Sequence, residues 1–280
     1  MLTGRVCIVT GASRGVGKGI AAAFGSAGAT VYVTGRSAKP DASPFGATVF
    51  ATAEEVTRRG GRGIAVVCDH SDDNQVRELF ARVQSESGRL DILVNNAAAI
   101  PDTLTDPGPF WSKPLDYSQL FDVGLRSYYT SSWFAAPMLN RQGGVIANTS
   151  SPAAFSYVHG PAYGASRAGV DKLAHDMAHD FKPHGVCVVS LWLGLVKTEQ
   201  VMSLTEKYGH LLSVAESPEY AGHIITALFE DPNRMTQSGK VHIAAELAQH
   251  YHLKDVNGSE PPSARGFLGG PPEYSSVIVE

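Results

Sequence analysis

The sequence predicts a doubly wound α/β fold, in which one parallel sheet of about seven strands is flanked by helices on both faces. Runs rich in Val and Ile are continuously apolar rather than alternating, as strands buried on both faces require. Segments of helical length, with apolar residues at three- and four-residue spacing, separate these runs. The 280 residues, 43% hydrophobic and 18% charged, provide enough apolar material for one large core.

Strands and helices alternate along the chain. The expected strands span residues 5–10, 29–34, 63–68, 90–95, 143–149, 186–192 and 240–244. The expected helices span residues 15–27, 71–87, 115–140, 163–181 and 217–229. Two stretches rich in Pro and Gly, 37–50 and 256–272, are expected to be irregular. We therefore predict a single domain over residues 1–250, followed by an irregular C-terminal tail or flap over residues 251–280.

Composition restricts the class of partner. The formal net charge is −4, and Lys and Arg are scattered, so no basic surface for nucleic acid or an anionic membrane is indicated. No secretory signal precedes the first strand, and no apolar run reaches the roughly 18 residues that span a bilayer. Cys7, Cys68 and Cys187 lie in apolar runs, an odd count that indicates buried thiols in a reducing compartment. We expect a cytoplasmic protein with a small-molecule partner.

A glycine-rich loop follows the first expected strand directly and opens the first expected helix. It contains three glycines, Gly11, Gly15 and Gly17, and the intervening residues Ser13, Arg14 and Val16. Glycines let the backbone turn tightly and approach a pyrophosphate, whose charge meets free N–H groups and the positive end of the helix dipole. The alternative is a strand-to-helix turn without a ligand. The position of the loop favours a dinucleotide.

The end of the second strand indicates which dinucleotide is bound. Folds of this kind that prefer NAD place an acidic residue there for the ribose hydroxyls, whereas this chain has Gly35 and Arg36. Arg36 and Arg14 together match a 2′-phosphate, although each alone could be an ordinary solvated side chain. NADP(H) is therefore predicted over NAD(H). Asp69 and Asn95, at the ends of the third and fourth strands, face the same crevice, and Asp69 could accept a hydrogen bond from the adenine amino group.

Four motifs in this order resemble those of the short-chain dehydrogenase/reductase superfamily, over residues 5 to about 200. They are the loop Thr10 to Gly17, the run Asn95-Asn96-Ala97, the pair Ser150-Ser151, and Tyr163 with Arg167 four residues later. Further phrases resemble one subfamily of it, at residues 123–126, 150–152, 171–174, 189–192 and 238–241.

The resemblance implies a Rossmann-type three-layer sandwich that exchanges a hydride between a nicotinamide and a carbonyl compound or secondary alcohol. By position, Tyr163 would be the catalytic acid/base, and Ser151 the hydroxyl that holds the substrate oxygen, with Ser150 as the alternative. Thr198 would contact the nicotinamide amide. Asn95, Ala97, Tyr163 and Arg167 would join the glycine loop in binding the cofactor. A homodimer or homotetramer is implied as well.

Two positions depart from the family pattern. Arg167 stands where lysine is usual; it keeps the charge and can hold the ribose hydroxyls, but it does not pass a proton along a relay. Gly124 stands where most members carry an asparagine that holds a relay water, although the subfamily shares the glycine. The alternative function is therefore a catalytically impaired NADP(H)-binding protein with a sensor or assembly role.

A third function would be a metal hydrolase. His175 and His179 stand one helical turn apart with Asp176 between them, which superficially resembles a zinc-protease helix. Aspartate is too short for the usual base and no third ligand is evident, so we expect no metal site. Substrate identity depends on loops around residues 100–114 and 198–217, which contain no motif that indicates a substrate.

Overall fold

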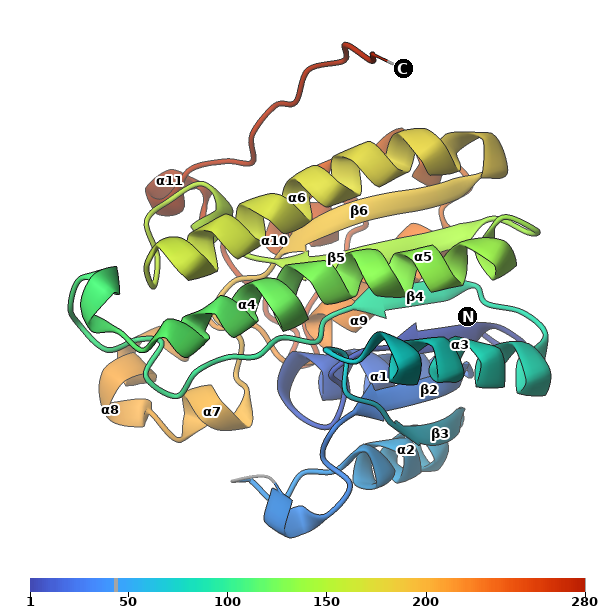
Figure 1. Ribbon diagram of the computed structural model, residues 1–280, viewed down its shortest axis with the longest axis horizontal. Helices are drawn as coiled ribbons and strands as arrows, with labels where there is room; N and C mark the ends of the chain where they lie inside the picture. The colour runs from blue at the N-terminus through green and yellow to red at the C-terminus, as the bar shows by residue number, and fades with distance from the viewer. Residues whose placement is uncertain (43–44, 280) are drawn as a thin grey trace.

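The computed structural model of the protein describes residues 1–42 and 45–279. Within them, seven strands form one parallel sheet in the order β3-β2-β1-β4-β5-β6-β7 (Figure 1). The strands are β1 Val6–Val9, β2 Thr30–Gly35, β3 Arg62–Val67, β4 Ile92–Asn95, β5 Gly144–Ser150, β6 Val186–Trp192 and β7 Val241–Ile243. The predicted Rossmann-type fold is confirmed.

Helices cover both faces of the sheet and enclose two apolar clusters (Figure 1). One cluster includes Phe24 and Ile224, and the other Phe80 and Phe181, all buried against strand residues. The first face carries α1 Gly15–Ser26, α2 Val49–Arg58, α9 Tyr220–Glu230 and α10 Ala244–His250. The second face carries α3 Asp73–Ser87, α5 Ser127–Leu139 and α6 Pro161–Phe181.

The connection after β2 departs from the expectation of an irregular stretch over residues 37–50. Its described part includes a 3-10 turn at Pro40–Ala42, but Val49 and Phe50 already belong to α2. Thr48 caps this helix by accepting a hydrogen bond of 3.0 Å from Ala51 N, and Val49 and Val56 bury its apolar face. The Pro and Gly content of the preceding stretch obscured this short helix.

The long central helix is divided where a continuous one was expected over residues 115–140. A 3-10 turn at Leu115–Ser118 leads into α4 Gln119–Phe121, then a π-helical turn at Asp122–Arg126, and then α5. Wide π turns are rare and often lie at functional sites. This one contains Gly124.

The C-terminal segment lies against the domain at several points. The Arg265 guanidinium pairs with Glu246 of α10 at 2.6 Å, and Ser156 Oγ donates to Leu268 O at 2.5 Å. Both contacts involve α11 Arg265–Leu268, and beyond it the Tyr274 ring lies 4.7 Å from the His175 ring of α6. Figure 1 shows this part of the chain running past α6.

The three thiols are buried, as predicted, and none forms a disulfide: Cys7, Cys68 and Cys187. Burial raises the pKa of Cys68 and of Cys187 to about 12, so both remain protonated at neutral pH. None of the helices in the described part of the chain is long and apolar enough to span a bilayer.

Candidate active site

The glycine loop is fastened to the end of the neighbouring strand β4. Thr10 Oγ1 donates to Val94 O at 3.2 Å and accepts from Asn96 N at 2.8 Å and Ala97 N at 3.0 Å. Because β1 and β4 are parallel neighbours, these contacts bring the loop and the Asn95-Asn96-Ala97 run to one edge of the sheet. Two motifs separated by more than eighty residues thus meet at one edge of the sheet.

Glycine is required at several positions of this loop. Gly11 and Gly15 have φ values of 63° and 57°, which L side chains rarely adopt. A Cβ at Gly11 would lie 2.7 Å from Ala97 Cα, and a Cβ at Gly17 would lie 2.5 Å from Gly11 O. The loop is therefore folded so tightly that no side chain fits between it and β4.

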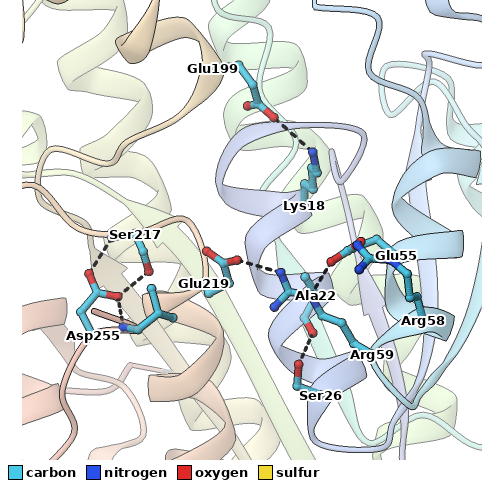
Figure 2. A network of polar contacts seen from close by, with 11 residues as sticks. Lys18, Ala22, Ser26, Glu55, Arg58, Arg59, Glu199, Ser217, Glu219 and Asp255 are labelled. Carbon is cyan, nitrogen blue, oxygen red and sulfur yellow. Dashed lines mark hydrogen bonds and ion pairs between the residues drawn. The ribbon is translucent and has the colours of Figure 1, made fainter. Parts of the chain in front are cut away.

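An anionic group already lies at the N-terminus of α1. Gly15 N donates to Glu199 Oε2 at 2.8 Å. Figure 2 shows Lys18 beside the same carboxylate, with its Nζ 3.6 Å from Glu199 Oε1. Free N–H groups, the helix dipole and Lys18 all favour negative charge at this point. The residues present therefore fit the diphosphate of a dinucleotide.

Glu199 reaches the loop from α7 Glu199–Met202, which Thr198 caps by accepting from Val201 N at 3.2 Å. A Cβ at Gly15 would lie 3.4 Å from Thr198 Cγ2, so the predicted nicotinamide contact lies directly beside the glycine loop. Glu199 itself was not among the predicted site residues. Its role depends on a contact across 184 residues, which no local pattern reveals.

Asn96 was not predicted to be a site residue, although the run Asn95-Asn96-Ala97 was recognised as a motif. Its Nδ2 donates to Thr10 O at 3.0 Å and Gly11 O at 3.1 Å, so it shapes the loop. The neighbouring Asn95 faces inward and is fully buried, with Nδ2 bonded to Ser132 Oγ at 3.0 Å and Asn148 Oδ1 at 2.8 Å. The Asn95 side chain therefore joins the ends of β4 and β5 to α5 in the protein interior.

The residues predicted to select the nucleotide lie along the same sheet edge. Arg36 follows β2 and is largely exposed, with Nη1 4.0 Å from Asp69 Oδ2. Arg14 occupies the N-cap position of α1 without a capping bond from its side chain. Its guanidinium carbon lies 5.7 Å from the centroid of the Phe45 ring. Burial opposes ionisation of Asp69, but hydrogen bonds from Ser71 and the charge of Arg36 together lower the pKa of this carboxyl. Ser13 lies at the same edge of the sheet, because a Cβ built on Gly35 would lie 3.7 Å from Ser13 Oγ.

Tyr163 lies in the first turn of α6, which begins after Gly160 with a φ of 95°. Its half-buried ring packs against an apolar cluster of Leu104, Tyr117 and Leu120. The ring of His159 lies 5.6 Å from that of Tyr163. The phenol thus stands beside an apolar wall contributed by the segment after β4.

The two candidate serines have different surroundings. Ser150 ends β5 and is buried, with Oγ 3.4 Å from Arg167 O, and it is also a hydrogen-bond partner of Asp171. Ser151 is less buried, and its Oγ accepts from Ala153 N at 3.2 Å at the start of a 3-10 turn. Ser151 therefore keeps its own hydroxyl proton available, whereas Ser150 belongs to an internal network.

Arg167 is almost completely buried, at 4% exposure, with its guanidinium between two tyrosine rings. Its Nη2 donates to Gly124 O at 2.6 Å and its Nη1 to Thr149 O at 3.2 Å. The guanidinium carbon lies 5.6 Å from the Tyr163 ring centroid and 5.8 Å from that of Tyr128. A fixed positive charge thus lies over the face of Tyr163.

Two buried carboxyls lie behind these residues. Asp171 accepts from Ser190 Oγ at 2.6 Å and Trp192 Nε1 at 2.7 Å, and burial, opposed by these bonds, raises its pKa to about 6. Glu216 accepts from Gly194 N at 2.9 Å, and burial raises its pKa to about 7, with Asp255 adding repulsion. Glu216 N also donates to Leu195 O at 2.8 Å, so this residue holds the segment that leads to Thr198.

The histidines considered for zinc have other contacts. His175 Nδ1 lies 3.1 Å from Gly239 O, and its ring packs on Tyr274. Within residues 1–42 and 45–279, no group of three His, Cys, Asp or Glu side chains could hold a metal ion.

Comparison with known proteins identifies a family. The short chain dehydrogenase family model matches residues 5–209. Dehydrogenase/reductase SDR family member 1 of Mus musculus is 42% identical over 273 residues, covering 92% of this chain and 85% of that protein. The 7alpha-hydroxysteroid dehydrogenase of Escherichia coli K12 is 29% identical over 205 residues, covering 72% of this chain and 75% of that protein.

Solved structures agree with the fold. A short chain dehydrogenase from Mycobacterium thermoresistibile superposes with a TM-score of 0.79 at 23% identity, covering 94% of this chain and 93% of that one. The family resemblance inferred from the motifs is confirmed. The resemblance to one subfamily is supported by the 42% identity to Dehydrogenase/reductase SDR family member 1 of Mus musculus.

Proposed function

This chain belongs to the short-chain dehydrogenase family, and from that premise we propose an NADP(H)-dependent oxidoreductase that acts on a carbonyl compound or secondary alcohol. The observation that carries the proposal is Tyr163 at the start of α6, with the Arg167 guanidinium carbon 5.6 Å from its ring. A phenol beside a fixed cation is suited to exchange a proton with a substrate oxygen.

NADP(H) would lie along the edge formed by the loop and the strand ends, and its nicotinamide would supply or accept the hydride. Gly11, Gly15, Val16, Gly17 and Ala97 would line the diphosphate site. Arg14, Arg36 and Ser13 would bind the 2′-phosphate, because paired guanidinium groups match phosphate geometry. Asp69 would contact the adenine. Arg167 would contact the ribose, and Thr198 would contact the nicotinamide amide.

Tyr163 would donate the proton to a carbonyl oxygen during reduction, or remove it from an alcohol during oxidation. Ser151 would hold the same oxygen by a hydrogen bond from its hydroxyl group. Arg167 would hold a positive charge beside the reacting phenol without taking part in proton transfer. Because the chain belongs to a family of oxidoreductases, the alternative of a catalytically impaired protein is not favoured.

The substrate would be an apolar ketone or secondary alcohol. Leu104, Tyr117 and Leu120 offer an apolar wall next to Tyr163, and one relative is named for a hydroxysteroid. We further propose that residues 1–250 form a single catalytic domain, that residues 251–280 form a flap, and that the protein is a cytoplasmic homodimer or homotetramer.

Cofactor titration followed by fluorescence tests the proposal. NADPH should bind more tightly than NADH. Arg36→Ala should weaken NADPH binding by about tenfold to a hundredfold, since a charged hydrogen bond contributes about 1.5–3 kcal/mol, and should leave NADH binding nearly unchanged. Arg141→Ala, exposed in the turn between α5 and β5, is the matched control. Equal binding of the two cofactors would reject the NADP(H) assignment.

The catalytic assignment is tested on the same preparation. Tyr163→Phe should keep NADPH binding and reduce the rate of ketone reduction by about 10²- to 10⁴-fold, because the proton donor is lost. Full turnover in this variant would reject Tyr163 as the acid/base.

A further inference from the structure

The two departures from the family pattern contact each other. Arg167 Nη2 lies 2.6 Å from Gly124 O, and a Cβ built on Gly124 would lie 2.6 Å from the same nitrogen. Real Cβ atoms do not approach other atoms so closely, so one of the two would have to move. The missing side chain at position 124 therefore provides the space that the guanidinium occupies.

Backbone conformation does not require glycine at this position. Gly124 is absent from the glycines with a left-handed backbone, and it lies in a π-helical turn whose other residues carry side chains. Alanine is a better helix former than glycine. What excludes alanine at 124 is the guanidinium of Arg167.

The arginine in turn depends on its fixed position. Its charge is desolvated, and Gly124 O and Thr149 O supply the hydrogen bonds that compensate for this, with Ser166 Oγ 3.4 Å from Nε. Asp171, one further turn along α6, supplies negative charge that Arg167 feels, since Arg167 lowers the pKa of that carboxyl. A lysine ammonium is a single point of charge and cannot reproduce the two divergent bonds to the carbonyls.

We propose that Gly124 and Arg167 form one unit, in which the glycine is a positioning residue that holds the guanidinium over Tyr163. Neither residue can be exchanged alone without displacing the charge from the phenol. The proposal rests on the proposed function, because the consequence of that displacement is measured on the reaction of Tyr163.

A double-mutant cycle of Gly124→Ala and Arg167→Lys tests the unit. In the parent protein, Gly124→Ala should lower Tm and reduce kcat/KM by at least about tenfold, equivalent to 1.4 kcal/mol. In the Arg167→Lys background, the same alanine should leave Tm unchanged or raise it, because the clashing nitrogen is gone and alanine favours the helix. Gly209→Ala, at a helical position with open space around its Cβ, is the control and should not lower Tm.

The separate effects on kcat and KM distinguish positioning from mere packing. In Gly124→Ala, displacing the guanidinium from the phenol should lower kcat for ketone reduction, whereas KM for the ketone should stay nearly unchanged, because the hydroxyl proposed to hold the ketone remains in place. An unchanged kcat in a Gly124→Ala protein with a lowered Tm would overturn the positioning role of Gly124.

The thermal cycle does not require turnover, so the two proposals fail separately. Additive changes in Tm and in kcat/KM would overturn the unit even in an active enzyme. A non-additive Tm cycle in a protein that binds NADPH but reduces no ketone would establish the unit and reject the proposed function.

Discussion

At the scale of single residues, protonation of the buried Glu216 carboxyl makes the free energy of unfolding depend on pH. Its pKa is raised to about 7 by burial and by repulsion from Asp255, whereas an unfolded chain leaves it near 4.5. Between these values the folded protein holds a proton that the unfolded chain has lost. The free energy of unfolding therefore decreases as pH rises from about 4.5 to 7.

Replacement of this carboxyl by an amide measures the effect. Glu216→Gln keeps an acceptor for Gly194 N and removes the charge, so the variant should be more stable than the parent by about 2–3 kcal/mol at pH 8. At pH 4.5 it should be no more stable, and urea unfolding at the two pH values compares them. Glu54→Gln, on the exposed face of α2, is the control. A gain of equal size at both pH values would contradict the assignment.

Single residues also show what the sequence can predict. Tyr163, Arg167 and the loop glycines stand in motifs with fixed local spacing, so they could be named in advance. Asn96, Glu199 and Glu216 act through contacts with distant parts of the chain, and their residue types alone suggest nothing specific. The pairing of Gly124 with Arg167 was hidden for the same reason, because a hydrogen bond across 43 residues joins them.

At the scale of secondary-structure elements, the start of α7 reaches the start of α1, where the diphosphate of the proposed cofactor would bind. The Glu199 carboxylate accepts from Gly15 N. It also pairs with Lys18 (Figure 2). Glu199→Gln should therefore tighten NADPH binding by about two- to fivefold, the equivalent of 0.3–1 kcal/mol for an anion at a helix N-terminus. Fluorescence titration at low ionic strength measures it, with Glu206→Gln on α8 (Thr205–Tyr208) as control. Weaker binding in Glu199→Gln would mean that the carboxylate helps to hold the cofactor.

Periodicity predicted all the strands of the described sheet and the long helices, because buried strands and amphipathic helices leave direct patterns. It did not predict α2 or the interruption of the central helix. Val49 and Val56 are the main apolar anchors of α2, too few to stand out after a Pro- and Gly-rich stretch. The π turn depends on how Gly124 packs against α6, which no local pattern encodes.

At the scale of the whole molecule, the C-terminal segment contacts both α10, which follows the edge strand β7, and the turn after β5. Arg265 is anchored on Glu246, and Leu268 on Ser156, which closely follows Ser151 in the chain. Truncation after Pro262 removes both contacts. Because the ion pair is partly exposed, Tm should fall by no more than about 2–4 °C. If residues 251–280 form the proposed flap, KM for the ketone should rise severalfold when the flap is lost.

Steady-state kinetics and a thermal melt measure the two effects of the truncation. Arg265→Ala keeps the full chain but removes the ion pair with Glu246, so it should show a smaller change in KM. An unchanged KM in both variants would rule out a flap.

The bonds that join the glycine loop to distant parts of the chain also set when the proposed nucleotide site can form during synthesis. Thr10 meets Asn96 across 86 residues, and Gly15 meets Glu199 across 184. At about 5–20 residues per second, a ribosome needs about 10–40 s to make the chain between Gly15 and Glu199. A growing polypeptide therefore carries its glycine loop without these contacts for much of translation, and the proposed nucleotide site is complete only after most of the chain has been made.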